Sequence, residues 1–279
     1  MEGIHNEDIL AENGIDPESI VTWDDLMAAC ETLLNNGVQP FEIGEMDNYR
    51  FGHLHTVLNY KTYGTDVAYD LGDRTMSYDS QEQLDIYQMI IDAYEAGYLG
   101  TNLLGTDDAQ EQEYFNSGEV PFYFIGSWYC ANAGTGDNEL FNQQKIHTIP
   151  FPYVNEEYAS HNMGGANEAL YVVDTGDEDE LAASVLFLKY MINVDKLNEL
   201  VEAYPILTAV NTSVEVDNYL LQEVQELMAD STSALGDIEN YDTAQHMMTT
   251  VRNALQGIPS GYSAEEVGET IVSETSQYE

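Results

Sequence analysis

The chain has 279 residues, of which 51 are Asp or Glu and 7 are Lys or Arg, so its formal net charge is -44. A surface this acidic repels phosphate backbones and anionic headgroups, which excludes binding to nucleic acids and polybasic attachment to membranes. Hydrophobic residues make up 43% of the chain, which is enough for a packed core, and the length favours two lobes over one.

The first half of the chain is predicted to form three helices and then a strand. The stretch 22–37 begins with Thr22 as N-cap and Asp25 three residues later, and it ends at a glycine. The stretches 80–97 and 107–117 show the same apolar spacing, and a glycine closes or follows each. The short, continuous apolar run 120–125 predicts a buried strand.

The second half is predicted to be mainly helical. Helical patterns cover 177–192, 195–203, 218–229, 241–256 and 263–276, and Ser263 with Glu266 forms a capping box at the start of the last. Short strands are predicted at 145–153 and 169–173. Dominant helices with scattered short strands indicate an α/β or α+β fold.

Motifs for cofactors and metals are missing from the sequence. Neither a nucleotide-binding glycine loop nor a zinc-type cysteine spacing occurs, so no cofactor and no metal are expected. His53 and His55 are predicted to alternate on a strand or turn, where polar packing is favoured over metal binding. Cys30 and Cys130 are interpreted as small buried residues, with a disulfide as the alternative.

The stretch 126–129, Gly-Ser-Trp-Tyr, is the most informative local motif. It follows directly on the predicted strand 120–125, and side chains just beyond such a strand end commonly face a ligand crevice. An indole there offers a flat apolar face and one N–H donor, which suit the C–H face and hydroxyl rim of a sugar. The sequence therefore predicts that Trp128 is a ligand contact, with a core position as the alternative.

The order of several motifs resembles the family 1 extracellular solute-binding proteins of ABC importers, the group that includes maltodextrin-binding protein. The motifs that carry the resemblance are Gly14-Ile-Asp-Pro17, Thr22-Trp-Asp-Asp-Leu26, Phe115-Asn-Ser-Gly-Glu119, the stretch 122–128 and Met163-Gly-Gly165. The resemblance implies a two-lobed periplasmic-binding-protein-like α/β fold of type II, with a nearly complete C-terminal lobe and a partial N-terminal lobe. Residues 1–162 and 213–279 would build the C-terminal lobe, and 163–212 would cross the hinge and add helices to the other.

Family members begin with further residues that include a signal peptide and often a lipidated cysteine. The start of this chain has neither a basic nor an apolar signal region, and it resembles the point at which the family's chain path enters the second lobe. The resemblance therefore implies that most of the N-terminal lobe is missing. The resemblance implies an extracellular or cell-surface protein, in contact with the membrane only through such a lipid anchor. In that case the apolar stripes of the two helices in 177–203 lack their partner surface, and we expect this segment to be loosely ordered or to self-associate.

The resemblance also implies a function and a binding site. The chain would be the carbohydrate-binding component of an ABC importer, with no reaction to catalyse and with permease subunits as partners. The implied ligand contacts are Trp128, Tyr129, Glu45, Asn48, Tyr49, Gly164, Gly165 and Asn167. Met248 stands where a second stacking aromatic is found in the family, so a site for long glucans is not expected. The alternatives are a binder of a non-sugar solute, such as a peptide or a polyamine, and a glycoside hydrolase.

Overall fold

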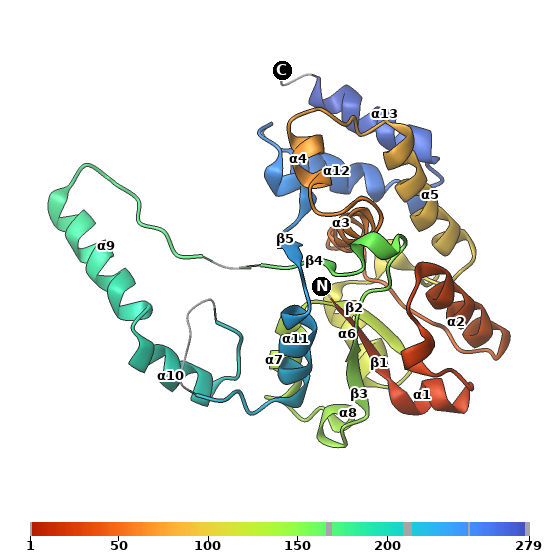
Figure 1. Ribbon diagram of the computed structural model, residues 1–279, viewed down its shortest axis with the longest axis horizontal. Coiled ribbons are helices and arrows are strands. Elements are labelled where there is room, and N and C mark those ends of the chain that lie inside the picture. The colour runs from red at the N-terminus through yellow and green to blue at the C-terminus, as the bar shows by residue number, and fades with distance from the viewer. Residues whose placement is uncertain (1, 166–168, 209–213, 245, 277–279) are drawn as a thin grey trace.

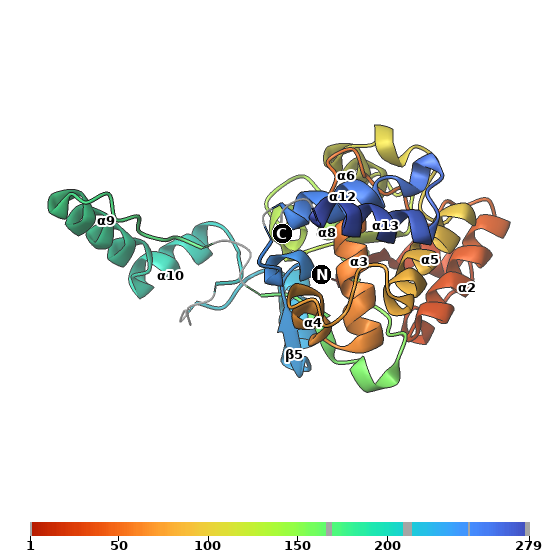
Figure 2. The same cartoon turned by 90° about the horizontal axis from the view of Figure 1, so that it is seen from above.

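The computed structural model describes residues 2–165, 169–208, 214–244 and 246–276 (Figure 1). Figures 1 and 2 both show a body, built from the two ends of the described chain, and a helical arm that projects from it. The arm consists of α9 (Glu178–Met191) and α10 (Val194–Ala203).

An antiparallel sheet of three strands lies at the centre of the body, in the order β2-β1-β3. The strands are β1 (Glu2–Asn6), β2 (Phe122–Ile125) and β3 (Ile146–Ile149). All four residues of β2 are buried, which confirms the strand predicted from its apolar run. β1 was not predicted from the sequence, although it is the central strand.

A second, smaller ribbon pairs β4 (His161–Met163) with β5 (Ser233–Leu235) in parallel. The chain leaves the body toward the arm just after β4 and comes back before β5 (Figure 1). The N–H of Gly164 donates to the carbonyl of Leu235 at 2.8 Å, which extends this pairing beyond β4. The ribbon therefore ties together the outgoing and returning segments of the chain.

The helices of the body build the two hydrophobic cores that meet at the sheet. They are α1 (Glu7–Glu12), α2 (Trp23–Asn35), α3 (Arg50–Tyr63), α4 (Val67–Gly72), α5 (Gln81–Glu95), α6 (Asp108–Asn116), α7 (Ser127–Ala133), α8 (Glu139–Asn142), α11 (Tyr219–Ala229), α12 (Met247–Leu255) and α13 (Ala264–Thr275). A short 3-10 turn, η4 (Ile238–Tyr241), precedes α12. The capping boxes predicted at Thr22 and Ser263 are both present.

Successive residues of β2 face two different hydrophobic cores. Phe122 and Phe124 join the larger core, with α2, α3, α5, α12 and α13, while Tyr123 and Ile125 join the smaller core, with α7 and α11. This alternation follows from the period of two in a strand. Cys30 is buried in the larger core and Cys130 in the smaller, as expected for small apolar side chains.

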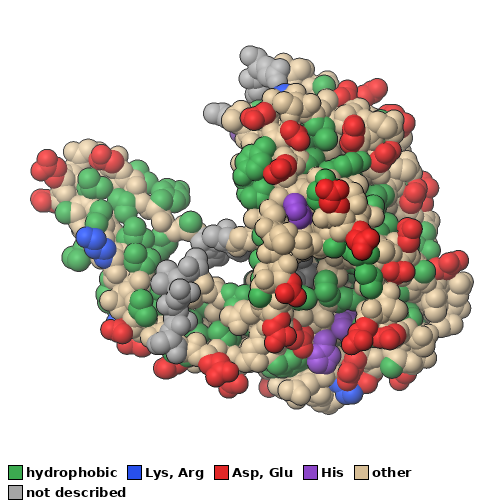
Figure 3. Space-filling model, viewed as in Figure 1, with side chains coloured by type: hydrophobic (Ala, Val, Ile, Leu, Met, Phe, Trp, Pro, Cys, Tyr) green, Lys and Arg blue, Asp and Glu red, His purple; other side chains and the backbone are tan. Residues whose placement is uncertain are grey.

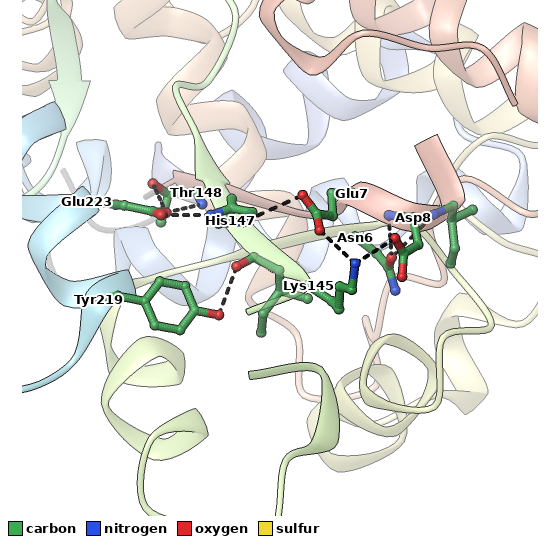
Figure 4. A network of polar contacts seen from close by, with 10 residues as sticks. Asn6, Glu7, Asp8, Lys145, His147, Thr148, Tyr219 and Glu223 are labelled. Carbon is green, nitrogen blue, oxygen red and sulfur yellow. Dashed lines mark hydrogen bonds and ion pairs between the residues drawn. The ribbon is translucent and has the colours of Figure 1, made fainter. Parts of the chain in front are cut away.

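Side chains of α11 cover the outer edge of β3 (Figure 4). Glu223 accepts the backbone N–H of Thr148 at 2.8 Å, and its other oxygen lies 2.8 Å from Nδ1 of His147. At the start of the same strand, the ammonium of Lys145 bridges Glu7 and Asp8. An edge strand with open N–H groups is prone to pair with other chains, and Glu223 occupies one of these groups.

Five helices were not predicted from the sequence, α1, α3, α4, α7 and α8, and α3 is the longest of them. His53 and His55 lie in α3, so their prediction as residues of a strand or turn was wrong. Every residue of α3 from Arg50 to Lys61 is buried. A helix that is enclosed on all sides has no polar stripe, and for that reason its sequence lacks the amphipathic spacing that identifies helices.

Three further predictions need correction. The stretch 169–173 was predicted to be a strand, but no described residue pairs with it and Tyr171 is 83% exposed, because a strand requires a neighbour for its backbone groups. The predicted helix 241–256 is shorter and begins only after His246, which has a left-handed φ of 71°. In the stretch 145–153, β3 ends before Pro150, which has no N–H for the ladder.

The arm exposes apolar side chains (Figure 3). No residue of α9 is buried, and Leu186, Phe187 and Tyr190 are 70%, 60% and 56% exposed. Only Val201, near the end of α10, joins the smaller core of the body. The arm therefore has an apolar surface that the described residues leave uncovered. That this segment is loosely ordered or self-associates stays a prediction.

Candidate functional site

Trp128 stands at the point where β2 turns into α7. A Cβ on Gly126 would lie 2.0 Å from Cζ3 of the indole, so only glycine lets the ring fold back across the end of the strand. The indole is half-buried and packs against both cores. One side of the Trp128 indole is therefore packed against the cores, while part of its surface is exposed to solvent.

Two further rings continue from Trp128 along α3. The ring centroid of His53 lies 6.3 Å from that of Trp128, and the ring of Tyr49 lies 5.0 Å from His53 in a T-shaped contact. Tyr49 and His53 are four residues apart, which places them on one side of the helix start. We call Tyr49, His53 and Trp128 the aromatic row.

A buried guanidinium supports the row from below. Arg50 is fully buried, with Nε 2.8 Å from Glu111 and Nη2 2.5 Å from Asp108. The hydroxyl of Tyr49 also donates to Asp108, and the guanidinium carbon lies 4.6 Å from the Tyr49 ring centre. These pairings allow the Arg50 guanidinium to be buried, because the attraction to its partners offsets the cost of removing its charge from water.

Asp237 and Arg252 reach the row from the distant C-terminal part of the chain. Nε2 of His53 lies 3.2 Å from Asp237, and Nη2 of Arg252 lies 3.0 Å from the same carboxylate oxygen. Although burial opposes ionisation, His53 and Arg252 keep the pKa of Asp237 below its usual value. Burial lowers the pKa of His53, and nearby Arg252 and Arg50 act in the same direction against the pull of Asp237. At neutral pH the site therefore contains a carboxylate beside a neutral imidazole.

Glu45 lies beneath the row and is fully buried. Its Oε2 accepts the backbone N–H of Phe51 at 2.9 Å. Burial raises the pKa of Glu45 to about 8 and the pKa values of Glu111 and Glu239 to about 7. Glu45 is therefore mainly protonated at neutral pH, and it contributes a neutral polar group in place of a charge.

Unsatisfied buried polar atoms gather around the row. Within the described part of the chain, the buried side-chain atoms here that have no hydrogen-bond partner are Glu45 Oε1, Asn48 Oδ1, Arg50 Nη1, His53 Nδ1, Glu239 Oε1, Glu239 Oε2 and Arg252 Nε. Buried polar atoms in native proteins almost always have a protein or water partner. Their concentration at one place is typical of a site that receives water or polar ligand groups.

The predicted contacts fall into separate environments. Trp128, Tyr49 and Asn48 are half-exposed at the row, and Glu45 lies below it. Tyr129 is 1% exposed, with its hydroxyl 2.7 Å from Asn116, so in this structure it packs in the core and presents no surface to a ligand.

The remaining predicted contacts belong to the segment that leaves the body. Gly164 and Gly165 follow β4, where the N–H of Gly164 donates to Leu235, and Gly165 has a φ of 131°, which favours glycine. Asn167 lies outside the described residues.

Sequence reasoning missed His53 as part of the row, together with Asp237 and Arg252. Recognition of α3 as a helix would have placed His53 beside Tyr49 by spacing alone. His55, by contrast, is fully buried, stacks on Tyr87 and lies 2.9 Å from Gln83, so the two histidines do not converge on one ion. No local signal connects Asp237 and Arg252 to the row.

An apolar cavity elsewhere in the body is unsuited to a polar ligand. It has a volume of about 40 Å³ and lies between the sheet and α2, with Trp23, Phe124 and Phe151 among its lining. Its lining is apolar throughout, so hydroxyl groups would lose their hydrogen bonds on entering it. The row is the better candidate.

Comparison with known proteins identifies the family. Residues 4–258 match the family described as Bacterial extracellular solute-binding protein. The chain belongs to this family. Arabinooligosaccharide-binding protein of Halalkalibacterium halodurans is 26% identical over 197 residues, which cover 70% of this chain and 42% of that relative. The matched segment of this solute-binding protein thus covers less than half the length of that relative.

Solved structures confirm the two-lobed α/β fold. A chitin oligosaccharide binding protein superposes with a TM-score of 0.83 at 18% identity, over 99% of this chain and 69% of that one. A Streptococcus pneumoniae solute-binding protein in complex with the blood group A-trisaccharide gives 0.76 at 20% identity, with the same coverage. Within the described residues, no helix is both long and apolar enough to cross a bilayer.

Proposed function

We propose that this solute-binding protein binds a mono- or oligosaccharide between its two lobes and delivers it to the permease of an ABC importer. The observation that carries the proposal is the aromatic row, in which the half-buried Trp128 adjoins buried polar atoms that have no hydrogen-bond partner in the described chain. A pyranose needs both features, because its C–H face stacks on a ring while its hydroxyl rim requires hydrogen bonds.

The family and its relatives support this substrate class. The relative with the longest match is named for arabinooligosaccharides, and the solved structures of the same fold include proteins named for chitin oligosaccharides or bound to a blood group trisaccharide. All three are binding proteins, which supports a function without catalysis. We place the complete protein at the cell surface or in the periplasm, held by a lipid anchor where a membrane contact exists.

Lobe assignment is part of the proposal. Residues 1–162 and 213–279 would form one lobe, and 163–212 would cross the hinge so that α9 and α10 contribute to the other lobe. The uncovered apolar face of α9 supports this assignment, because such a face needs a partner surface. Closure of the lobes would then bury the sugar and form the surface that the permease recognises.

A polyamine fits the row less well than a sugar. The carboxylates beside the row are already paired within the chain, Asp108 with Arg50 and Asp237 with Arg252. A bound cation would have to compete with these arginines for its counter-charge. A sugar hydroxyl needs no net charge and suits the unpaired polar atoms directly.

Binding measurements on the full-length protein test the proposal. Calorimetry would use arabinotriose, chitotriose and stachyose, with spermidine and a tripeptide as non-sugar probes. We expect one sugar to bind and, at a concentration of 100 times its Kd, to stabilise the fold by about 2.7 kcal/mol. Trp128→Ala should weaken binding by about 1–3 kcal/mol, and because the indole also packs against both cores, its effect on stability is measured separately by urea unfolding.

The second tryptophan provides a matched control. Trp23 is 8% exposed in the larger core, so Trp23→Phe should lower stability and leave sugar affinity unchanged. Unaltered binding in Trp128→Ala, or a response only to spermidine or the peptide, would overturn the proposal. New reducing ends during incubation with the sugars would favour a glycoside hydrolase.

A further inference from the structure

His53 is in contact with both other members of the aromatic row. Its ring centroid lies 5.0 Å from Tyr49 and 6.3 Å from Trp128. Tyr49 and Trp128 are both half-exposed, whereas His53 is only 8% exposed between its neighbours. A ligand seated on the two outer rings would therefore lie close above the imidazole.

Asp237 determines which nitrogen of His53 carries the proton. The Asp237 carboxylate lies 3.2 Å from Nε2, and a carboxylate only accepts hydrogen bonds, so Nε2 is the protonated nitrogen of the neutral ring. Arg252 fixes this carboxylate from the other side at 3.0 Å. Nδ1 is consequently left with a lone pair and acts as an acceptor.

No donor reaches this acceptor within the described part of the chain. Nδ1 is buried and has no hydrogen-bond partner there. An acceptor that is removed from water without a replacement donor is destabilising, and native folds seldom keep one without a purpose. A ligand that supplies a donor at this position would remove the cost, whereas a ligand without one would leave it in place.

We propose that His53 is a specificity-determining residue of the sugar site, which accepts at Nδ1 a hydrogen bond from one hydroxyl of the bound sugar. The inference rests on the proposed function, because a sugar stacked on Trp128 carries the hydroxyl donors that Nδ1 lacks. It also separates sugars by stereochemistry. Only a sugar with a hydroxyl directed at Nδ1 satisfies the acceptor, and an epimer or deoxy analogue leaves it unpaired.

The charged groups that face His53 make this contact sensitive to pH. They are Asp237 of the β5–α12 connection, Arg252 of α12 and Arg50 of α3, with the Tyr49 hydroxyl as a further titratable neighbour. Protonation would remove the Nδ1 lone pair and add a third cation beside the two arginines. Since burial lowers the pKa of His53, binding should be full at neutral pH and should weaken as the pH falls through that lowered value.

Two substitutions separate the two nitrogens of the ring. His53→Gln places an amide near the position of Nε2, where it can keep the contact with Asp237, but it offers no acceptor at the position of Nδ1. His53→Asn has a shorter side chain that ends near the position of Nδ1. It therefore keeps an acceptor at that position and loses the contact with Asp237. The same change two residues later, His55→Gln, is the matched control, because His55 lies on the opposite side of α3 and is directed toward Gln83.

Calorimetry on the full-length protein would use whichever of arabinotriose, chitotriose and stachyose binds the wild type, together with its monodeoxy analogues. We expect the wild type to lose roughly 5- to 100-fold in affinity for one deoxy position, the effect of a single buried hydrogen bond. His53→Gln should bind the parent sugar roughly 5- to 100-fold more weakly than the wild type does, and it should bind the parent sugar and this deoxy analogue equally well. His53→Asn should retain the discrimination, and the acid-side loss of affinity should be absent from His53→Gln.

The outcomes distinguish a failure of the proposed function from a failure of the proposed role of His53. A wild type that binds no sugar overturns the proposed function and this inference with it. Sugar binding that His53→Gln leaves unchanged, in affinity and in discrimination, overturns the inference alone. If circular dichroism shows that His53→Gln is unfolded, His53→Asn decides, and a loss of discrimination in this variant contradicts the proposed contact.

Discussion

Helices α3 and α9 have the same length, 14 residues, but opposite surroundings. α3 buries charged and polar side chains, whereas α9 buries nothing and exposes leucine, phenylalanine and tyrosine. Burial at these two places does not follow from the polarity of the residues themselves. It follows from whether the rest of the chain supplies a surface that fits them.

The polar side chains of α3 have specific partners, although Arg50 Nη1, His53 Nδ1 and His55 Nδ1 lack one in the described chain. Asn59 and Gln83 exchange a hydrogen bond at 2.6 Å. The ammonium of Lys61 donates to the carbonyl of Ala159 at 2.6 Å and to Asn162 at 2.7 Å. These partners come from distant parts of the sequence, which is why the helix can be enclosed. α9 has the opposite condition, because the described chain provides no surface for its apolar face.

Removal of the Arg50 guanidinium from α3 is expected to have the largest effect on the stability of the fold. Arg50→Met leaves Glu111 and Asp108 without their buried counter-charge, which should lower the free energy of unfolding by about 3–5 kcal/mol. Urea denaturation measures the loss. The double variant Arg50→Met with Glu111→Leu should recover part of the loss, because no charge then remains buried unpaired at Glu111. A loss below about 1 kcal/mol would mean that the pairing is not needed for burial.

The same leucine truncation in each helix sharpens the comparison. Leu58 of α3 is 0% exposed and Leu186 of α9 is 70% exposed. Leu58→Ala should cost about 2–5 kcal/mol through lost contacts and a cavity, and Leu186→Ala should change stability by less than about 0.5 kcal/mol. Thermal or urea unfolding of both variants provides the values. A large cost for Leu186→Ala would show that α9 packs on a surface in solution.

A further expected effect is a change in the pH dependence of stability, caused by the neutral carboxyl of Glu45 under α3. The pKa of Glu45 is raised in the fold to about 8, so its stabilising contribution is full below its usual value and is lost as the pH rises toward 8. Glu45→Gln cannot ionise, so its stability relative to the wild type should rise between pH 5 and pH 8, by up to about 1.4 kcal/mol per pH unit. Unfolding in urea at both pH values measures the difference.

An exposed glutamate controls for the change in net charge. Glu31→Gln, on the solvent side of α2, removes the same charge without a buried group. It should shift stability by a similar small amount at both pH values. If Glu31→Gln reproduced the pH 8 gain of Glu45→Gln, overall charge repulsion would explain the effect and burial of Glu45 would not.

The sequence by itself determined those features whose cause is local. The ends of α2 and α13 follow from capping residues at Thr22 and Ser263, and β2 follows from a continuous apolar run. The sequence also predicted that Trp128 lies just beyond β2, because a glycine and a serine after a strand are typical of a turn. The order of these short motifs along the chain was sufficient to indicate the family and its fold.

Only the tertiary structure decided which residues join Trp128 and which segments stay uncovered. Asp237 and Arg252 reach His53 from the far end of the chain, and no spacing rule connects them. The sequence of α3 lacks an amphipathic period, because distant partners allow its polar residues to be buried. The stretch 169–173 does not form a strand, because no described segment pairs with it. The physical reason is the same in each case. Capping and turns depend on nearby backbone groups, whereas burial, pairing and pKa depend on surfaces that come together only when the chain has folded.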